Sequence, residues 1–417
     1  MAEGPSELEL LARRARDASG AIALAPPRVR TDALLACAEA VERAAEPILA
    51  ANAADLARAE AGGTSGALLD RLRLDAARVA SMAAGLRGVA GQPDPVGRVV
   101  DGWTLPNGLR VRRVRVPLGT IGVIYEARPN VTADAAALAL RSGNAILLRG
   151  SSLAEASNLA VATAIGEGLG AVGLPQALVS LVQDTSRAGG VAFLRLDGLL
   201  DCVVPRGGPS LLATVASSAT VPVVLDGAGN CHVYVDAGAD LEMALAIVAN
   251  AKCSRPGVCN AAETLLVHEE VAAAFLPRLE AHLPGVELRA DPRAAALLPG
   301  AVAATAADFA TEFLDLVLAV GVVADLEEAI THIARYGTGH SEAIVTEDRR
   351  AAERFVAAVD AAAVLVNAST RFVDGGELGF GAEIGISTQK LHVRGPMGAE
   401  ALTTVKLVVE GDGQVRD

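Results

Sequence analysis

Residues 117–150, PLGTIGVIYEARPNVTADAAALALRSGNAILLRG, contain the pattern that decides the fold class. A run of β-forming residues at 121–125 is followed by a helical run at 132–141 and a second β-forming run at 145–148. Short strands separated by helices of about ten to fifteen residues are typical of βαβ units with a parallel sheet. The alternation continues downstream, with a helix expected at 154–168 and strands expected at 178–182, 202–204 and 221–225. The pattern predicts an α/β protein, in which nucleotides commonly bind at the carboxyl ends of the strands.

The chain on the N-terminal side of this stretch has a helical pattern from residue 6 to about residue 91. Ser6 and Glu9 have the spacing of a capping box, and apolar residues then recur every three or four positions. About three helices are expected here. The period changes at residues 103–116, WTLPNGLRVRRVRV, where Asn107-Gly108 between two extended arms predicts a β-hairpin. The second arm alternates valine with arginine, so one of its faces is strongly basic.

A second α/β region is expected from residue 236 to about residue 382. Its expected helices span residues 241–252, 269–282 and 325–336. The tail, residues 384–409, mixes β-type residues with Gly395-Pro396 and is expected to be extended. The length of 417 residues agrees with two or three domains, each able to bury its own core.

Composition excludes several classes of protein. The chain has 36 Lys and Arg against 49 Asp and Glu, a formal net charge of -13, which argues against a nucleic-acid partner. No stretch of about 20 residues lacks both charges and helix breakers, so no membrane segment is expected. The acidic start of the sequence lacks the basic and apolar regions of an export signal, which favours a cytoplasmic location.

The cysteines and histidines point the same way. Five cysteines are scattered along the chain, an odd number that argues against a disulfide framework and fits a reducing compartment. The sequence has no H-E-x-x-H and no C-x-x-C motif, so no metal site is expected. One reactive thiol remains an open alternative.

The one G-x-G-x-x-G in the chain, at Gly168, Gly170 and Gly173, lies after a helix and before a strand. A dinucleotide fingerprint must follow a strand and open a helix, because the helix N-terminus has to face the pyrophosphate. We therefore interpret these glycines as the end of a helix and a turn.

Two strand ends are better candidates for binding a nucleotide. Arg149-Gly150-Ser151-Ser152 offers a cation, a flexible glycine and two hydroxyls before the next helix, which suits a phosphate monoester. No carboxylate stands in that stretch to accept a bond from a ribose 2'-hydroxyl, which favours NADP over NAD. An ordinary strand exit with a serine cap explains the same residues equally well. Gly207 and Gly208 also lie between a strand and a helix and could meet a pyrophosphate.

Cys259 is the strongest candidate nucleophile. Pro256-Gly257 breaks the preceding helix and leads Cys259 towards an apolar strand at 264–267. Lys252 and Arg255 nearby would favour the thiolate and attract an anionic substrate. The alternative is that Cys259 is a small buried hydrophobic residue, the usual state of a lone cysteine. Cys253 is the main rival of Cys259 as the nucleophile. Cys37 and Cys202 are expected on a helix face and within a strand, where they are structural.

Taken together, several long segments in a fixed order resemble one family. They cover residues 117–132, 143–150, 255–260 (RPGVCN), 366–372 (VNASTRF) and 387–398 (STQKLHVRGPMG). The chain resembles the glutamate-5-semialdehyde dehydrogenases, also called gamma-glutamyl phosphate reductases, of proline biosynthesis. Runs of this length are far more specific than any single short motif.

That family belongs to the aldehyde dehydrogenase superfamily, and the resemblance implies its architecture. It implies an NADP-binding domain from residues 1–99 and 118–235, a catalytic domain with the nucleophilic cysteine at 236–383, and a small β element. The β element would join the hairpin at 100–117 to the tail at 384–417 and serve oligomerisation. A homo-oligomer is therefore expected.

The resemblance also implies the site and the reaction. Cys259 matches the nucleophile and Asn130 the side-chain donor to the oxyanion. Cofactor contacts are expected from Arg149 at the adenosine ribose, from Ser152 in place of a carboxylate, from Glu312 at the nicotinamide ribose, and from Ser151, Gly207 and Gly208. Candidate contacts to the substrate are Arg128, Arg255, Asn367, Ser369, Thr370 and Arg371, for which a structural role is about as well supported.

The implied reaction is the NADPH-dependent reduction of L-glutamyl 5-phosphate to L-glutamate 5-semialdehyde through a thioester, with release of phosphate. One departure from the superfamily fits it: where hydrolytic members carry a glutamate base, the nearest acid here is Asp226. The implied partners are this small-molecule substrate and, as a hypothesis, the upstream glutamate 5-kinase. The alternatives are an enzyme of the same fold that oxidises another aldehyde or an acyl-CoA with NAD, and a non-catalytic scaffold.

Overall fold

The computed structural model describes residues 5–64 and 66–416, which fold into two compact units. The first unit contains the chain up to Leu225 together with Gly379–Gly385 and the segment from Met397 onward. The second unit contains Asp226–Leu378 and Ile386–Pro396. Each unit has its own sheets and is described by itself. The segment Ile386–Pro396, which the sequence analysis joined to the tail, is thus part of the second unit.

The N-terminal region of the first unit is helical, as predicted, but its described residues form five helices rather than about three. These are α1 (Glu7–Ala23), α2 (Pro27–Arg43), α3 (Ala45–Ala61), α4 (Gly66–Leu72) and α5 (Ala76–Ala90). The capping box of Ser6 and Glu9 opens α1, which confirms that prediction. The count was missed because α2 and α3 are separated only by Ala44, and alanine gives no break in the pattern.

The first unit is built on a parallel sheet in the order β5-β4-β3-β6. Its strands are β3 (Thr120–Tyr125), β4 (Ala145–Arg149), β5 (Val179–Leu181) and β6 (Cys202–Arg206). The connecting helices are α6 (Asn130–Arg141), η1 (Ser152–Ala154), α7 (Glu155–Ala171), η2 (Gln176–Leu178), α8 (Arg187–Phe193) and α9 (Pro209–Ser218). The βαβ prediction is confirmed. The strand expected at 221–225 is wrong, because Pro222 lacks an N–H and only Val223 makes a bridge, to Val203.

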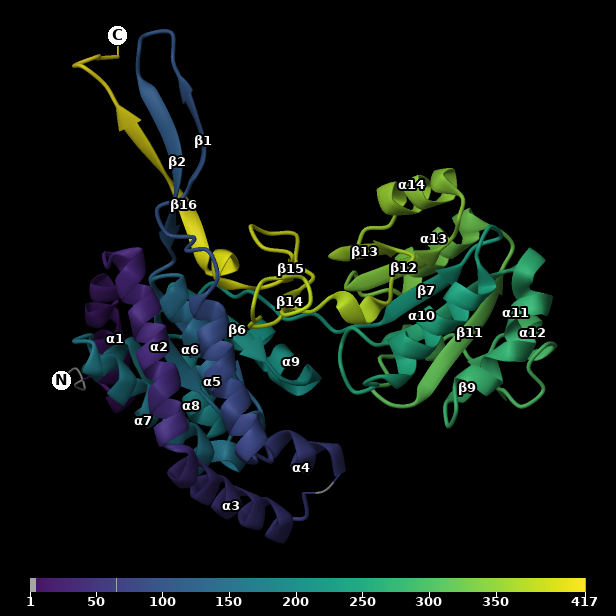
Figure 1. The fold of residues 1–417 in the computed structure, drawn as a ribbon, viewed down its shortest axis with the longest axis horizontal. Coiled ribbons are helices and arrows are strands. Elements are labelled where there is room, and N and C mark those ends of the chain that lie inside the picture. Colours follow the sequence, from purple (N-terminus) through teal and green to yellow (C-terminus); the bar gives the residue numbers. More distant parts are fainter. Residues whose placement is uncertain (1–4, 65, 417) are drawn as a thin grey trace. The chain divides into compact units, whose positions relative to one another are not determined.

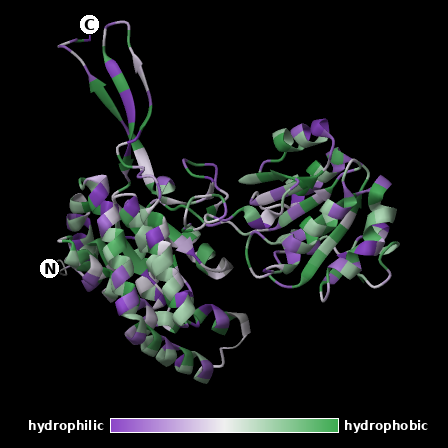
Figure 2. Ribbon diagram, in the orientation of Figure 1, coloured by the Kyte–Doolittle hydropathy of each residue, from purple (hydrophilic) through white to green (hydrophobic). Residues whose placement is uncertain are grey.

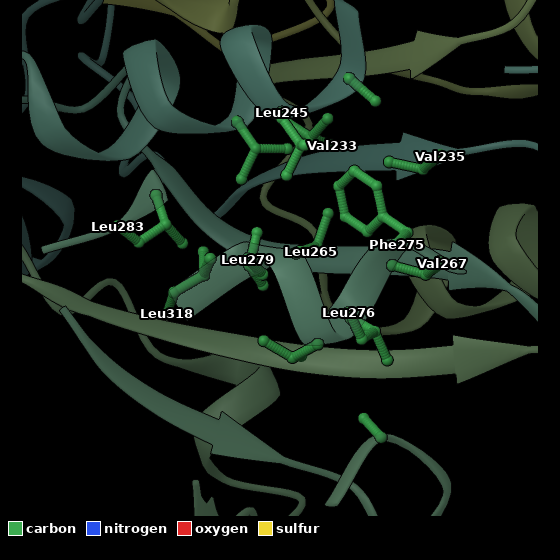
Figure 3. Close-up of a cluster of buried hydrophobic side chains, with 14 of the residues drawn as sticks. Val233, Val235, Leu245, Leu265, Val267, Phe275, Leu276, Leu279, Leu283 and Leu318 are labelled. Carbon is green, nitrogen blue, oxygen red and sulfur yellow. The ribbon is translucent and has the colours of Figure 1, made fainter. Parts of the chain in front are cut away.

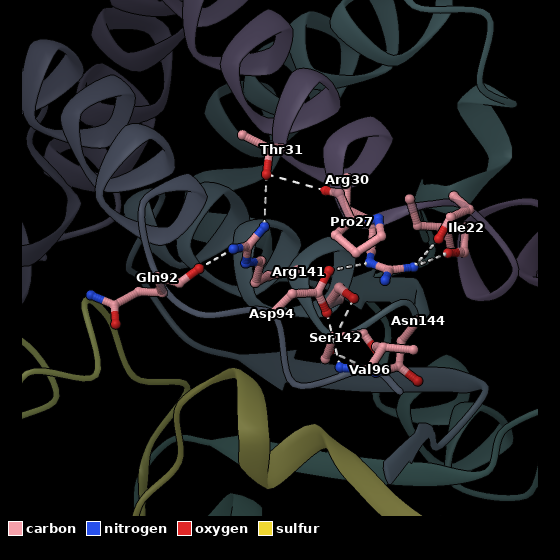
Figure 4. Close-up of polar contacts among 12 residues, drawn as sticks. Ile22, Pro27, Arg30, Thr31, Gln92, Asp94, Val96, Arg141, Ser142 and Asn144 are labelled. Atoms are coloured by element: carbon pink, nitrogen blue, oxygen red, sulfur yellow. Dashed lines mark hydrogen bonds and ion pairs between the residues drawn. The ribbon is translucent and has the colours of Figure 1, made fainter. Parts of the chain in front are cut away.

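Buried cations tie the helices of the first unit to its loops (Figure 4). Arg30 of α2 is 2% exposed and its Nε donates to Asp94 Oδ2 at 2.8 Å, while the same guanidinium donates to the carbonyls of Ile22 and Ala25. Arg141, at the end of α6, donates to the carbonyl oxygen of Gln92. Because these buried charges are paired and hydrogen-bonded, they fix the loop around Gln92 and Asp94 rather than forming a ligand site.

The second unit has a seven-stranded, wholly parallel sheet in the order β10-β9-β11-β8-β7-β12-β13. The strands are β7 (Cys231–Val235), β8 (Ala262–His268), β9 (Glu287–Ala290), β10 (Val302–Ala303), β11 (Val317–Val323), β12 (Ser341–Val345) and β13 (Ala363–Val366). The helices are α10 (Leu241–Cys253), α11 (Glu269–His282), α12 (Pro292–Ala295), η3 (Asp308–Ala310), α13 (Leu326–Tyr336), α14 (Arg349–Ala358) and η4 (Thr370–Phe372). The helix predicted at 269–282 is confirmed with the same bounds.

The core of the second unit lies between this sheet and helices α10 and α11 (Figure 3). Phe275 and Leu279 of α11 pack with Leu265 and Val267 of β8, all of them fully buried. Continuous apolar strands such as Leu265–Val267 are typical of parallel sheets that are covered on both faces.

A three-stranded antiparallel sheet extends from the first unit (Figure 1). The hairpin β1 (Val99–Thr104) and β2 (Arg110–Pro117) turns at Asn107-Gly108, and β16 (Thr403–Glu410), preceded by η5 (Ala399–Leu402), pairs with β2. This confirms the predicted hairpin. The alternating side chains of β2 give it hydrophilic bands between apolar ones (Figure 2). The short pair β14 (Ile386–Ser387) and β15 (Gly395–Pro396) belongs to the second unit.

Within the described residues, every helix is too short or too polar to cross a membrane.

Candidate active site

Cys259 lies in the loop that connects α10 to β8. A buried ion pair closes this loop: Lys252 Nζ at the end of α10 lies 2.6 Å from Glu263 Oε2 at the start of β8, and neither side chain is exposed. The charge of Lys252 is therefore neutralised inside the unit. The influence of Lys252 on the Cys259 thiol stays a prediction, and its partner Glu263, eleven residues away, is not visible in the local sequence.

The backbone of Cys259 is held from behind by the segment 229–231. A Cβ atom at Gly229 would lie 1.5 Å from the carbonyl oxygen of Cys259, so only glycine fits there. The Cys231 thiol donates to the same oxygen at 3.1 Å. Glu312 Oε1 in turn accepts from the Gly229 N–H at 2.7 Å. The carbonyl of Cys259 is thus fixed by two contacts to the segment 229–231.

Arg371 and Arg255 bring positive charge close to Cys259. The Nε of Arg371 donates to Ser254 Oγ at 3.2 Å, and its guanidinium also donates to Asn260 Oδ1. Burial lowers the pKa of Arg371, the charge of Arg255 lowers it further, and Cys259 acts in the opposite direction. Arg255 and Cys259 therefore both lie within electrostatic range of Arg371. Cations beside a thiol favour the thiolate, and a pair of arginines suits a phosphate.

The other substrate candidates of the second unit divide into two groups. Ser369 caps η4 and accepts from the Arg371 N–H, and the buried Thr370 hydroxyl has no hydrogen-bond partner among the described residues. Asn367, in contrast, bonds to the backbone of Thr346 through both its oxygen and its nitrogen, at 2.9 Å each. With a φ of 55°, it shapes the turn after β13. The structure therefore gives Asn367 a structural role.

Asp226 is held by the backbone of its own unit. Its Oδ1 accepts from the Ile386 N–H at 2.8 Å, and a Cβ at the following residue, Gly227, would clash with Thr388. This backbone bond fixes the orientation of the Asp226 carboxylate. The second unit thus combines a cysteine and two cations without a free base at this position.

Asn130 begins helix α6 in the first unit, shortly after the end of β3. Arg128, in the connection between the two, is half-buried. Its side-chain nitrogen donates to Asp134 Oδ2 at 2.9 Å, one helical turn further on. The amide of Asn130 is thereby oriented by a residue that the sequence analysis did not single out.

A pocket lies at the carboxyl ends of β4 and β5. It is lined by Gly150, Ser151, Glu155, Asn158, Leu159, Leu181, Val182, Gln183 and Thr185. A Cβ at Gly150 would lie 2.1 Å from Asn158 Nδ2, so this position requires glycine. Arg149 already uses two of its N–H groups within the protein, since it donates to the carbonyls of Asp184 and Ser186. Ser151 Oγ accepts from the Ala127 N–H at 3.2 Å, whereas Ser152 is exposed.

Glu155 corrects one argument from the sequence. The stretch Arg149–Ser152 has no carboxylate, but Glu155 in the first turn of α7 lines the same pocket. The absence of an acid in the loop therefore does not by itself favour NADP.

The turn at Gly207 and Gly208 is occupied by the protein's own carboxylate. Glu126 Oε2 accepts from the Gly208 N–H at 3.0 Å, and a Cβ at Gly207 would lie 2.7 Å from the same oxygen. A negative group at this helix N-terminus agrees with the predicted preference for anions. No local pattern indicated that the anion would be Glu126, which lies 82 residues before Gly208.

Glu312 lies where two buried contacts meet. Glu312 itself accepts from the Gly229 N–H. Two residues further on, the Leu314 N–H donates to Glu263 Oε1 at 3.1 Å. Burial raises the pKa of Glu312 above its ordinary value. One carboxylate oxygen of Glu312 is therefore used to hold the segment behind Cys259, a role that the sequence analysis missed.

The remaining cysteines are structural. Burial raises the pKa of Cys37 to about 12 and that of Cys202 to about 11, and it also raises the pKa of Cys253. The glycine motif is structural as well: a Cβ at Gly168 would lie 2.6 Å from Cys37 Cα, so this glycine allows α7 to pack closely on α2. The interpretation of 168–173 as a helix end is confirmed, with Gly173 at a φ of 76°.

The chain is similar to known proteins along nearly its whole length. The model of the "Aldehyde dehydrogenase family" matches residues 2–315. A gamma-glutamyl phosphate reductase of Moorella thermoacetica is 56% identical over 412 residues, which are 98% of this chain and 99% of the relative. One of Thermobifida fusca is 53% identical over 412 residues, again 98% and 99%. The crystal structure of gamma-glutamyl phosphate reductase from Thermotoga maritima matches with a TM-score of 0.96 at 48% identity, covering 99% of this chain and 100% of that one.

The chain therefore belongs to the aldehyde dehydrogenase family and, within it, to the gamma-glutamyl phosphate reductases. This confirms the predicted fold class, an aldehyde dehydrogenase-like α/β fold with parallel sheets. Membership of the family also carries a nicotinamide cofactor with it.

Proposed function

We propose that this protein reduces L-glutamyl 5-phosphate to L-glutamate 5-semialdehyde in proline biosynthesis, with NADPH as reductant and a thioester on Cys259 as intermediate. The names of its full-length relatives support the reaction. The observation that carries the chemistry is the second-unit site, where Cys259 has Arg255 and Arg371 nearby while Asp226 is held by a backbone N–H. Such a site favours attack on a phosphorylated acyl group over activation of water.

The thiolate of Cys259 attacks the acyl carbon, and the bond to the phosphate oxygen breaks when the tetrahedral intermediate collapses. Phosphate is already a good leaving group, so no general acid is required. Arg371 and Arg255 neutralise its charge, while Asn130 and the Cys259 N–H donate to the oxyanion. Substrate candidates kept in this proposal are Arg128, Arg255, Ser369, Thr370 and Arg371.

The first-unit pocket fits a nucleotide cofactor. Its walls are apolar at Leu159, Leu181 and Val182, which suits a ring, and polar at Ser151, Glu155 and Asn158, which suits ribose hydroxyls. We propose that Arg149, Ser151, Ser152 and Glu312 contact the cofactor, and that Gly207 and Gly208 do so once Glu126 is displaced. When bound, the cofactor supplies the hydride that reduces the thioester.

We further propose a homo-oligomer in the cytoplasm. The β1-β2-β16 sheet supports oligomerisation because Trp103, Leu407 and Val409 are 45%, 62% and 53% exposed on it. The odd number of cysteines, five, scattered along the chain, supports a reducing compartment. Channelling of the unstable acyl phosphate is the argument for an association with glutamate 5-kinase, and a pull-down that recovers no kinase under mild conditions would count against it.

The reaction is tested in reverse, because the acyl phosphate is unstable in water. Purified protein receives glutamate 5-semialdehyde and NADP with and without inorganic phosphate, beside Cys259→Ala. Formation of NADPH that needs both phosphate and Cys259 is the expected result. Turnover without phosphate would identify a hydrolytic aldehyde dehydrogenase instead, and no turnover would contradict the proposal.

A further inference from the structure

Asn130 and Asp134 form a pair in the first turns of α6. The two residues are one turn apart and lie on the same face of the helix, and Asn130 Nδ2 donates to Asp134 Oδ2 at 2.9 Å. The other carboxylate oxygen lies against α5, where a Cβ at Gly85 would be 3.6 Å from Asp134 Oδ1. Asp134 thus lies close to α5 and is hydrogen-bonded to Asn130. Every atom in this arrangement belongs to the first unit.

The chemistry of the pair is asymmetric. An amide side chain can present either its NH₂ group or its oxygen to a neighbour, but an ionised carboxylate only accepts hydrogen bonds. Asp134 therefore selects the orientation of Asn130 in which the NH₂ group faces it and the amide oxygen points the other way. The nitrogen keeps a second N–H, which remains available to a ligand. An oxyanion needs that N–H, and the opposite orientation would present it with a repelling oxygen.

We infer that Asp134 is a positioning residue for the reaction: it fixes the amide of Asn130 in the orientation that donates to the oxyanion of the tetrahedral intermediate. The inference rests on the proposed function, in which Asn130 is the oxyanion donor. Asp134 itself touches neither substrate nor cofactor in this scheme, so its whole effect passes through Asn130.

The ionisation of Asp134 gives the inference a pH signature. Burial raises the pKa of Asp134 to about 6, opposed by the bond from Asn130 and by the positive charge of Arg206 at the end of β6. Below that pH the carboxyl is protonated and no longer discriminates between the two amide orientations. The rate of the wild-type enzyme is therefore expected to fall as the pH drops through about 6, and Asp134→Asn should lack this dependence.

The decisive experiment is a double-mutant cycle with Asn130→Ala and Asp134→Asn, measured in the reverse reaction with phosphate present. Asp134→Asn keeps the shape of the side chain but accepts either amide orientation, so kcat should fall about tenfold while the KM values change less than about twofold. Asn130→Ala should cost about 10²- to 10³-fold in kcat. In the Asn130→Ala background, Asp134→Asn should then have no further effect on kcat.

Two controls separate positioning from simple destabilisation. Asp75→Ala removes the side chain that caps the neighbouring helix α5 and should lower the melting temperature without altering kcat. The rate at which iodoacetamide modifies Cys259 should be the same in Asp134→Asn and in the wild type. An equal loss of kcat from Asp134→Asn in both backgrounds, or an unchanged kcat in the wild-type background, would overturn the inference. Failure of the wild-type enzyme to turn over would instead refute the proposed function, and the inference would fall with it.

Discussion

The loop that carries Cys259 and the turn at Gly207 and Gly208 both bear groups that suit anion chemistry, yet the chain treats them differently. At Cys259 the contacts from Gly229 and the Cys231 thiol are made to the carbonyl oxygen, an atom that takes no part in the reaction. At Gly208 the protein uses the N–H itself, which donates to Glu126. The Cys259 backbone is thus held through its carbonyl, whereas a ligand that binds the Gly208 N–H has to displace the Glu126 carboxylate. Substitutions on each side of this difference should therefore have effects of different size.

The largest effect is expected at the nucleophile. Cys259→Ala should lower the phosphate-dependent rate by about 10⁴-fold or more, because no other group can form the thioester. Cys253→Ala is the matched control, six residues away at the end of α10, and should keep the rate within about twofold. Stopped-flow detection of NADPH measures both. If Cys253→Ala were the inactive variant, the assignment of the nucleophile would be wrong.

Gly229→Ala should come next, because its Cβ would overlap the Cys259 carbonyl oxygen. We expect a loss of roughly 3 kcal/mol in the free energy of unfolding. The rate should fall about 100-fold as the Cys259 backbone moves. Gly20→Ala in α1, where a Cβ meets no atom within 4 Å, should be neutral or slightly stabilising. Thermal unfolding and kcat measured together test this. If Gly229→Ala kept the stability and kcat of the wild type, the contact between Gly229 and the Cys259 carbonyl would be unimportant.

Arg371→Met should raise the KM for inorganic phosphate in the reverse reaction by about 10- to 100-fold, since it removes a cation from beside Cys259. Arg371→Lys keeps the charge but loses the fork that bonds Ser254 and Asn260, so a smaller increase is expected. The KM for NADP is the internal control and should not change. Equal effects on both KM values would argue that Arg371 supports the fold of the loop rather than the phosphate.

The smallest effects are expected on the cofactor side. Glu126→Gln weakens the competitor for the Gly208 N–H and should tighten NADP binding about two- to fivefold, as measured by calorimetry. Glu155→Gln removes a negative charge from the pocket and should raise the preference for NADPH over NADH by a similar factor. Weaker binding in Glu126→Gln would show that this carboxylate helps to bind the cofactor.

Local patterns in the sequence were sufficient for much of this fold. The helix at 269–282, the hairpin around Asn107-Gly108 and the alternation from residue 120 to 206 follow from spacing and turn chemistry, and the structure has all three. The count of N-terminal helices failed because Ala44 interrupts the helix without any sequence signal. The segment 221–225 failed because an apolar run outweighed the proline within it.

The site was less predictable, for one physical reason. A motif shows which groups are present, but their partners come from distant parts of the chain. Lys252 is paired with the buried Glu263, and Asn367 bonds to the backbone of Thr346. Neither partner is visible in the segment that holds the residue. Asn260 was passed over beside Cys259, although it links that loop to Arg371 and to the carbonyl of Val373. Contacts of this kind depend on the folded sheet and are not written in any single segment.

The central claim is that Cys259 accepts the acyl group and that phosphate, rather than water, is its partner. The most direct measurement is mass spectrometry of the protein after reaction with freshly generated L-glutamyl 5-phosphate in the absence of nicotinamide cofactor. The account predicts a glutamyl adduct on the peptide that contains Cys259, stable in buffer and removed when inorganic phosphate is added. An adduct on another cysteine, or one that water removes as quickly as phosphate does, would contradict it.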